Sequence, residues 1–135
     1  MRAFLTVKSG FSAAHRLYRP DWSEEKNREV FGLCANPNGH GHNYELEVTV
    51  EGPIDPETGM ILDMKALKAL VQSEILDKVD HMNLNVDVPF LEGTIPTAEV
   101  LAAAFWDVLV NQIPAGRLYE VRLHETGRNV AFVRG

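Results

Sequence analysis

Residues 42–51 constrain the fold of this chain more than any other segment. Apolar and polar residues alternate along them, and the apolar set is Tyr44, Leu46, Val48 and Val50. Successive side chains of a β-strand point to opposite faces of its sheet, so the pattern predicts a half-buried antiparallel strand with one wet face. The apolar face needs a covering layer, because a sheet with one hydrophobic face must bury it against another element.

Further strands are predicted before and after this segment. Residues 3–15 place Phe11, Ala13 and His15 on one face, with the other parity left for Ser12 and Ala14. Near the C-terminus, alternation resumes and a turn leads to a last strand over residues 130–134. The inward-facing set before that turn is Tyr119, Val121, Leu123 and Glu125.

The middle of the chain has helical periodicity instead. Asp63 can cap a helix over about residues 64–79, and Thr97 can cap a second helix that follows it. Residues 18–39 and 82–96 read as irregular, and the first is long enough to suggest a binding loop. The order ββααββ predicts an α+β fold in which two helices cover one face of an antiparallel sheet.

Composition narrows the function classes. A length of 135 residues fits one domain, expected over residues 1–135. The formal net charge of −6, with no basic stripe of interleaved aromatics, argues against a nucleic acid or an anionic membrane as partner. A single cysteine, Cys34, excludes an internal disulfide and suits a reducing compartment. Without a signal-type N-terminus or a membrane-spanning stretch, the expected location is the cytoplasm.

His15, His40 and His42 form the first candidate site. Two histidines two positions apart on a strand point the same way, and here they extend the apolar face of residues 44–50. Gly41 between them leaves room for close approach. Three histidines with an open fourth position are the ligand pattern of catalytic zinc. The alternative is a set of hydrogen-bonded core histidines without a metal.

Three other features could carry chemistry. Cys34 precedes the histidines in the long loop, where it is either a small buried hydrophobe or a base whose thiolate form a nearby metal favours. Asp80-His81 is either an ordinary helix C-terminus or a carboxylate that orients an imidazole proton relay. Glu125 puts a carboxylate on an inward face, where it is solvated, paired with an arginine, or an anchor for a guanidine-like ligand edge.

Together these segments resemble the 6-pyruvoyl-tetrahydropterin synthase family, which includes the bacterial 6-carboxytetrahydropterin synthases of queuosine synthesis. The resemblance covers nearly the whole chain, and its motifs occur in order at matching separations. They are residues 11–17 (FSAAHRL), 34–44 (CANPNGHGHNY), 54–60 (IDPETGM), 76–84 (LDKVDHMNL), 96–99 (PTAE) and 121–126 (VRLHET).

The resemblance implies a role for each candidate residue. The Zn²⁺ ligands would be His15, His40 and His42. The catalytic residues would be Cys34 as general base and Asp80 with His81 as proton relay. The pterin would be held by Glu125, with Thr97 and Glu99 lining the pocket.

The resemblance also implies a fold and an assembly. The family fold is the T-fold, a ββααββ unit that forms trimers in which the sheets close into a β-barrel, and two trimers pair into a hexamer. The active site of such an assembly lies between subunits. Asp80 and His81 would then act on the zinc site of a neighbouring subunit.

The implied reaction is elimination of triphosphate from 7,8-dihydroneopterin triphosphate, giving 6-pyruvoyl-tetrahydropterin for tetrahydrobiopterin biosynthesis. The related carboxy synthases use the same substrate and also release acetaldehyde. Residues 34–42 look like the pyruvoyl branch, whereas residues 96–100 look like the carboxy branch, so both products stay open. A non-catalytic pterin-binding zinc protein is the alternative of another class.

Overall fold

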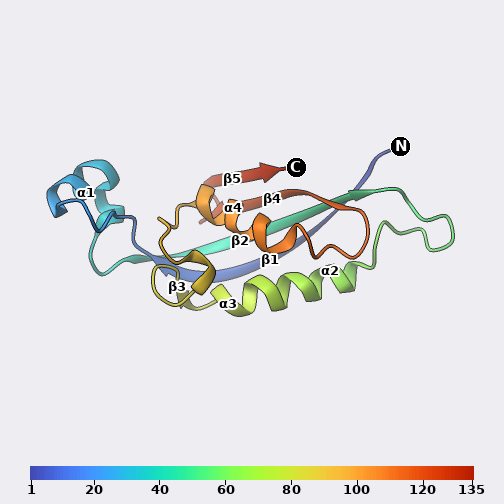
Figure 1. The fold of residues 1–135 in the computed structure, drawn as a ribbon, viewed down its shortest axis with the longest axis horizontal. Helices are drawn as coiled ribbons and strands as arrows, with labels where there is room; N and C mark the ends of the chain where they lie inside the picture. The colour runs from blue at the N-terminus through green and yellow to red at the C-terminus, as the bar shows by residue number, and fades with distance from the viewer.

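A five-stranded sheet forms the frame of the molecule, and the computed structural model describes all residues from 1 to 135 (Figure 1). The strands lie in the order β3-β1-β2-β4-β5, and the four long ones are paired antiparallel. Their bounds are β1 Ala3–His15, β2 His40–Gly52, β4 Arg117–Glu125 and β5 Asn129–Arg134. The predicted α+β class is confirmed.

The sheet is mixed rather than purely antiparallel. The short strand β3 (Met82–Asn83) lies beside the end of β1 and runs parallel to it. It falls in residues 82–96, which the sequence left irregular, as does the 3₁₀ turn η3 (Pro89–Leu91). Two residues are too few to show a period, so neither element is visible in the sequence pattern.

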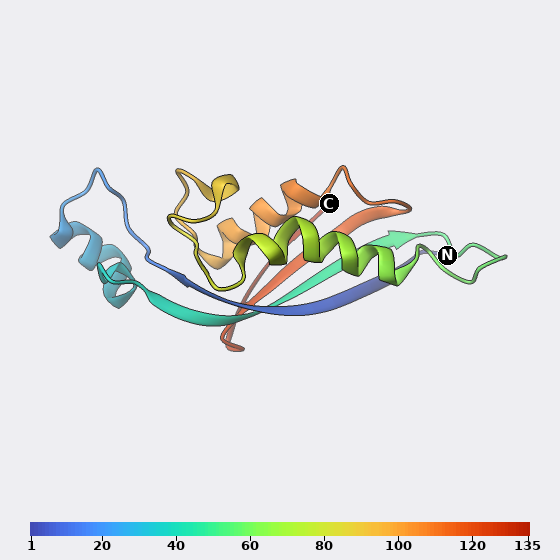
Figure 2. The same ribbon diagram turned by 90° about the horizontal axis from the view of Figure 1, so that it is seen from below.

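Two helical segments cover one face of the sheet (Figure 2). The helix predicted over 64–79 is present as a continuous run: α2 (Met64–Val71), a π-helical turn η2 (Gln72–Leu76) and α3 (Asp77–Val79). The second is α4 (Ala98–Leu109). Both predicted caps are confirmed, because the Asp63 side chain accepts from the Lys65 backbone N–H and Thr97 accepts from that of Val100.

The core lies between the sheet and these helices. Leu46 and Val48 of β2 are completely buried, and so are Leu67 of α2 and Phe105 of α4. Burial of side chains of this size stabilises the fold by about 1.5–3 kcal/mol each relative to exposure. The alternating pattern of residues 42–51 therefore predicted correctly which face is covered.

Residues 18–39 are more ordered than the sequence suggested. They contain α1 (Glu24–Phe31), capped by the Ser23 side chain, and the 3₁₀ turn η1 (Gly32–Ala35). Only Asn27 of α1 is buried, and the helix projects from one end of the molecule (Figure 1). A helix that covers no core carries no apolar stripe, which is why its period could not be recognised.

A β-bulge in β4 corrects one predicted orientation. Thr49 of β2 pairs with Glu120, whereas the next residue pairs with Leu118. Leu118 therefore takes the buried position, and Tyr119 lies on the uncovered face against Phe4, with ring centroids 4.8 Å apart. Beyond the bulge the predicted parity is correct, so Glu125 lies on the helix-covered side of its strand.

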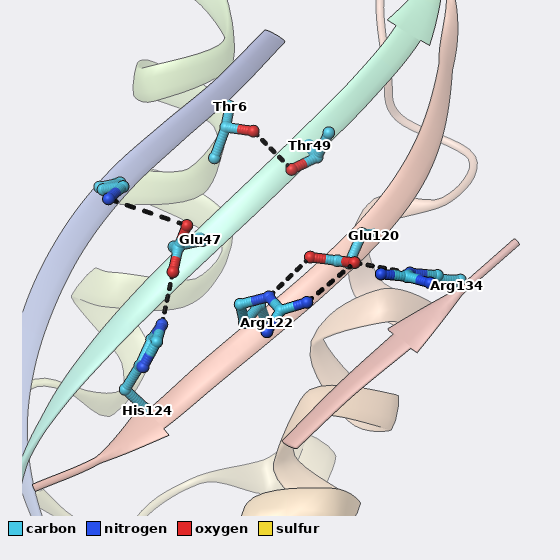
Figure 3. A network of polar contacts seen from close by, with 8 residues as sticks. Thr6, Glu47, Thr49, Glu120, Arg122, His124 and Arg134 are labelled. Atoms are coloured by element: carbon cyan, nitrogen blue, oxygen red, sulfur yellow. Dashed lines mark hydrogen bonds and ion pairs between the residues drawn. The ribbon is translucent and has the colours of Figure 1, made fainter. Parts of the chain in front are cut away.

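The uncovered face of the sheet holds paired charges (Figure 3). The Glu120 carboxylate accepts from Arg122 Nε at 2.8 Å and from Arg134 Nε at 2.7 Å. Glu47 on the same face accepts from His124. The hydrogen bond from Arg122 lowers the pKa of Glu120 below its ordinary value, and the bond from Arg134 adds to the effect.

None of the helices combines the length and apolar character needed to cross a lipid bilayer.

The ion pairs of Glu120 with Arg122 and Arg134 should make a pH-dependent contribution to the stability of the fold. Because the pKa is depressed in the folded state, the contribution is present above the unfolded-state pKa of about 4.3 and is lost as the pH falls through the folded value. Glu120→Gln should therefore lower the free energy of unfolding at pH 7 by about 1–2 kcal/mol. Urea denaturation at pH 7 and pH 3 measures both values. An equal difference between variant and wild type at the two pH values would contradict this account, and Glu57→Gln in an exposed turn is the control.

Candidate active site

The pairing of β1 with β2 brings three histidines to one end of the sheet. His15 lies opposite His40, and Ala13 lies opposite His42, in the antiparallel register. The strand begins at His40, so His40 and His42 share the helix-covered side with Tyr44. The three imidazole centroids are 4.7–5.0 Å apart.

The close approach of His40 to His15 depends on Gly39. A Cβ on Gly39 would lie 3.0 Å from the His15 carbonyl oxygen, and its φ of +72° is one that glycine adopts without strain. Gly41, to which the sequence assigned this role, is less critical. A Cβ there would make an ordinary contact at 3.7 Å from the Ala13 oxygen.

Hydrogen bonds hold the imidazoles with their Nε2 atoms toward one another. His15 Nδ1–H donates to the Pro96 carbonyl at 2.8 Å, which leaves His15 Nε2 as a lone-pair donor, 3.1 Å from His40 Nε2. His42 Nδ1 bonds to Thr126 Oγ1 at 2.7 Å. In both histidines Nδ1 is hydrogen-bonded and Nε2 faces the cluster. Hydrogen-bond partners of metal-binding histidines orient the rings in the same way.

The cluster fits a metal ion. One ligand atom from each histidine lies within 4.8 Å of the others, and His42 Nε2 is buried with no hydrogen-bond partner. Two nitrogens on one tetrahedral zinc are about 3.3 Å apart, close to the His15–His40 spacing. Burial lowers the pKa of both His15 and His40, and neighbouring imidazoles lower it further, so both are neutral ligands at neutral pH.

No fourth protein ligand joins the three histidines. Neither Cys34 nor Glu125 belongs to the group of mutually close ligand atoms. Structural zinc sites use four protein ligands, whereas catalytic sites keep one position for water or substrate. The donor set is therefore of the open type.

Glu125 is the charged residue beside the cluster. It ends β4 opposite Tyr44, and its Oε1 is 3.6 Å from His42 Nε2. Burial raises the pKa of the Tyr44 phenol well above its ordinary value, and the Glu125 charge adds to this, so Tyr44 stays protonated. The Tyr44 hydroxyl is 3.4 Å from His15 Nδ1. A half-buried carboxylate thus lies next to the three imidazoles.

Asp80 and His81 form a pair at the edge of β1, apart from this cluster. Asp80 Oδ1 accepts from the Ser12 backbone N–H at 2.9 Å, the main cause of its lowered pKa, and lies 3.0 Å from His81 Nδ1. The His81 side chain is 82% exposed. It borders a shallow depression that also reaches His42 and Thr126. Within one chain no hydrogen bond or ion pair joins Asp80 or His81 to the three histidines.

Cys34 and Thr97 lie near the end of β1, whereas Glu99 lies against β5. Cys34 lies in η1, and its backbone oxygen accepts from Leu17, two residues after His15, at 2.8 Å. Thr97 caps α4 directly after Pro96, whose carbonyl orients His15. Glu99 borders a hollow of about 270 Å³ against β5.

The sequence did not point to Thr126, Tyr44 or Pro96 as site residues. Pro96 acts through a carbonyl, which has no sequence signature. Tyr44 was taken as one member of an apolar face. Thr126 follows Glu125 directly, but only the pairing of β2 with β4 shows that it reaches His42.

The chain is similar to known proteins over nearly its whole length. The sequence model of the 6-pyruvoyl tetrahydropterin synthase family matches residues 4–135. The chain is 43% identical to a Homo sapiens 6-pyruvoyl tetrahydrobiopterin synthase over 134 residues, covering 99% of this chain and 92% of that protein. It is 47% identical to the Drosophila melanogaster protein of the same name, covering 98% and 80%.

Solved structures show the same fold. A Caenorhabditis elegans 6-pyruvoyl tetrahydropterin synthase superposes with a TM-score of 0.93 at 39% identity, covering 100% of this chain and 96% of that one. A Plasmodium falciparum structure of the same name, at 17% identity, has a TM-score of 0.72 over 99% and 98% of the two chains, which shows likeness of fold alone.

The fold and the three-histidine site define a pterin-synthase class of lyase. The chain belongs to the 6-pyruvoyl tetrahydropterin synthase family, as the resemblance predicted, and it is an enzyme. The comparisons support a pyruvoyl-type synthase function in tetrahydrobiopterin biosynthesis and favour it over the alternatives.

Metal binding predicts a difference between two histidine variants. His40→Ala should lose the metal that purified wild type retains after dialysis, because two imidazoles are too few to hold it. His81→Ala removes a histidine that belongs to neither group of close ligand atoms and should keep it. Elemental analysis of the dialysed proteins measures the metal content per chain. A metal-free but active wild type, or equal loss in both variants, would contradict the assignment.

Proposed function

We propose that this chain is a zinc-dependent lyase that converts 7,8-dihydroneopterin triphosphate to 6-pyruvoyl-tetrahydropterin with elimination of triphosphate. The observation that carries the proposal is the cluster of three histidines with one buried, unpartnered Nε2 and no fourth ligand. Such a site binds substrate oxygens at its open position. Family membership gives the substrate class.

His15, His40 and His42 would hold the Zn²⁺. When bound, the ion supplies a Lewis acid that polarises the side-chain hydroxyl oxygens of the substrate and acidifies the neighbouring C–H bonds. The lowered pKa of His15 and His40 favours this role, because these two ligands need no deprotonation before the metal binds.

Glu125 would anchor the pterin. A carboxylate accepts two parallel N–H bonds from a guanidine-like edge, and the pterin ring presents that edge. The 3.6 Å between Glu125 Oε1 and His42 Nε2 supports this assignment, since ring and side chain of one substrate could then reach the anchor and the metal together. Thr97 and Glu99 are proposed to line the pocket near Pro96.

Cys34 would act as the general base. Its loop is tied to the segment after His15 through the bond from Leu17 N–H to the Cys34 carbonyl, which holds η1 near the end of β1. The thiolate would remove a proton from the substrate side chain, after which triphosphate leaves and the product tautomerises. General-base catalysis of this kind contributes typically 10²–10⁴-fold.

Asp80 and His81 would complete the site of a second copy of this chain. Their carboxylate–imidazole pair suits a proton relay, because Asp80 fixes His81 through Nδ1 and leaves Nε2 to exchange a proton. Both their place at the β1 edge and the exposure of His81 favour use by a neighbour. A cytoplasmic homohexamer, built as two trimers of barrel-closing sheets, is the assembly that we propose.

Two alternatives differ from this proposal, one in the reaction product and the other in the number of protein ligands on the zinc. A 6-carboxytetrahydropterin synthase would use the same residues and release acetaldehyde as well as triphosphate. A non-catalytic zinc protein is disfavoured because the three histidines lack a fourth ligand.

Mass analysis of the product tests the proposed function. Incubation of the purified protein with 7,8-dihydroneopterin triphosphate should give one triphosphate per turnover and a pterin that keeps its three-carbon side chain. Acetaldehyde together with a carboxypterin would instead assign the chain to the queuosine branch. Absence of any turnover in the zinc-loaded protein would favour the non-catalytic alternative.

Mixing two inactive variants tests whether the site is shared. Cys34→Ala should retain zinc and fold but lose turnover, and His81→Ala should do the same. If each site takes Cys34 from one chain and His81 from another, random reassembly of equal amounts should recover about a quarter of wild-type activity.

The recovery distinguishes the two arrangements of the site. Were both residues supplied by one chain, every site in the mixture would keep one defect and no activity would return. A mixture of Cys34→Ala with Cys34→Ser, which restores no complete site, is the matched control. Full turnover by Cys34→Ala alone would remove Cys34 from the mechanism.

A further inference from the structure

The side chain of Thr126 contacts the histidine cluster, although the residue lies in an exposed turn. Its Oγ1 is 2.7 Å from His42 Nδ1, and its backbone N–H donates to the Asn43 carbonyl at 3.1 Å. The residue lies in the turn between β4 and β5, directly after Glu125, and is itself exposed. Every other part of this turn faces solvent.

The backbone at Thr126 is in a conformation that disfavours threonine. Its φ is +53°, in the left-handed region, and the next residue, Gly127, has a φ of +76°. Residues in the left-handed region are most often glycine, asparagine or aspartate. A β-branched residue is a genuine outlier there. The turn would therefore form with less strain without threonine, and the hydroxyl contact with His42 is the feature that only threonine or serine supplies.

The hydroxyl governs which nitrogen of His42 can bind a metal. A neutral imidazole carries one proton, and it binds a metal through Nε2 only when that proton is on Nδ1. His15 has this tautomer fixed by the Pro96 carbonyl, which can only accept. For His42 the partner is the Thr126 hydroxyl, which accepts from Nδ1–H in the tautomer that leaves the buried, unpartnered Nε2 with its lone pair.

We infer that Thr126 is a positioning residue for the metal centre, holding His42 in the Nδ1–H tautomer with Nε2 directed at the ion. The inference rests on the proposed zinc site. It also links the two halves of the site, because Thr126 follows the proposed pterin anchor Glu125 on the same strand end. A shift of this turn would move the anchor and the ligand-orienting hydroxyl together.

Three substitutions separate the hydroxyl from the backbone. Thr126→Val keeps the shape of the side chain and removes the hydroxyl. Thr126→Gly also removes it but relieves the strain of the positive φ. Thr126→Ser restores a hydroxyl. Thr58→Val, in another exposed turn and remote from the histidines, is the matched control.

Zinc affinity, measured by competition with a chromogenic chelator, is the decisive readout. Loss of the hydrogen-bond partner of a metal-binding histidine typically weakens metal binding by about 10–100-fold. Thr126→Val and Thr126→Gly should each raise the zinc Kd by about that factor, whereas Thr126→Ser and Thr58→Val should stay near wild type. Nitrogen-15 spectra of the histidine rings should show a mixture of His42 tautomers in the first two variants only.

The outcomes distinguish this inference from the proposed function. If wild type binds zinc and Thr126→Val binds it equally tightly, water replaces the hydroxyl and the inference is wrong while the zinc site stands. If Thr126→Gly keeps wild-type affinity and Thr126→Val does not, backbone strain rather than the hydrogen bond is responsible, which also overturns it. If wild type binds no zinc, the proposed metal site itself fails.

Discussion

The antiparallel register of β1 and β2 is the constraint on which the rest of the site depends. It sets His15 opposite His40 and Ala13 opposite His42, so three imidazoles meet at one end of one face. A slip of one residue would send every side chain of a strand to the opposite face. Packing prevents such a slip, because the same register stacks Phe11 on Tyr44 with ring centroids 4.7 Å apart. The hydrophobic core therefore fixes the geometry of the proposed metal ligands.

The two faces of the sheet serve different purposes. On the covered face, burial lowers the pKa of His15 and His40, and His42 Nε2 has no hydrogen-bond partner. The uncovered face satisfies its charges in pairs, as Glu120 does with Arg122 and Arg134 (Figure 3). Asp80 and His81 make no hydrogen bond to the histidine cluster, and the exposure of His81 is the structural reason for proposing a site shared between copies of the chain.

Supporting contacts come from segments far apart in the sequence. His15 is oriented by Pro96, which precedes α4, and His42 by Thr126 in the last turn. Each histidine bonded in this way is held by a group more than 80 positions away. Such contacts make the ligand geometry a property of the whole fold, so a mutation in the β4–β5 turn can act on the metal.

Local patterns in the sequence determined the long strands, the helix over 64–79, both helix caps and the choice of His15, His40 and His42. These depend on side-chain periods of 2 and 3.6 residues and on capping chemistry, which neighbouring residues specify alone. Helix α1 was missed because it covers no core, and Tyr119 was misplaced because a bulge shifts the period without a sequence signal. Only the tertiary structure decided that Thr126 meets His42 and that His81 borders the same shallow depression as His42. Those facts follow from strand order and register, which are set by packing between distant segments.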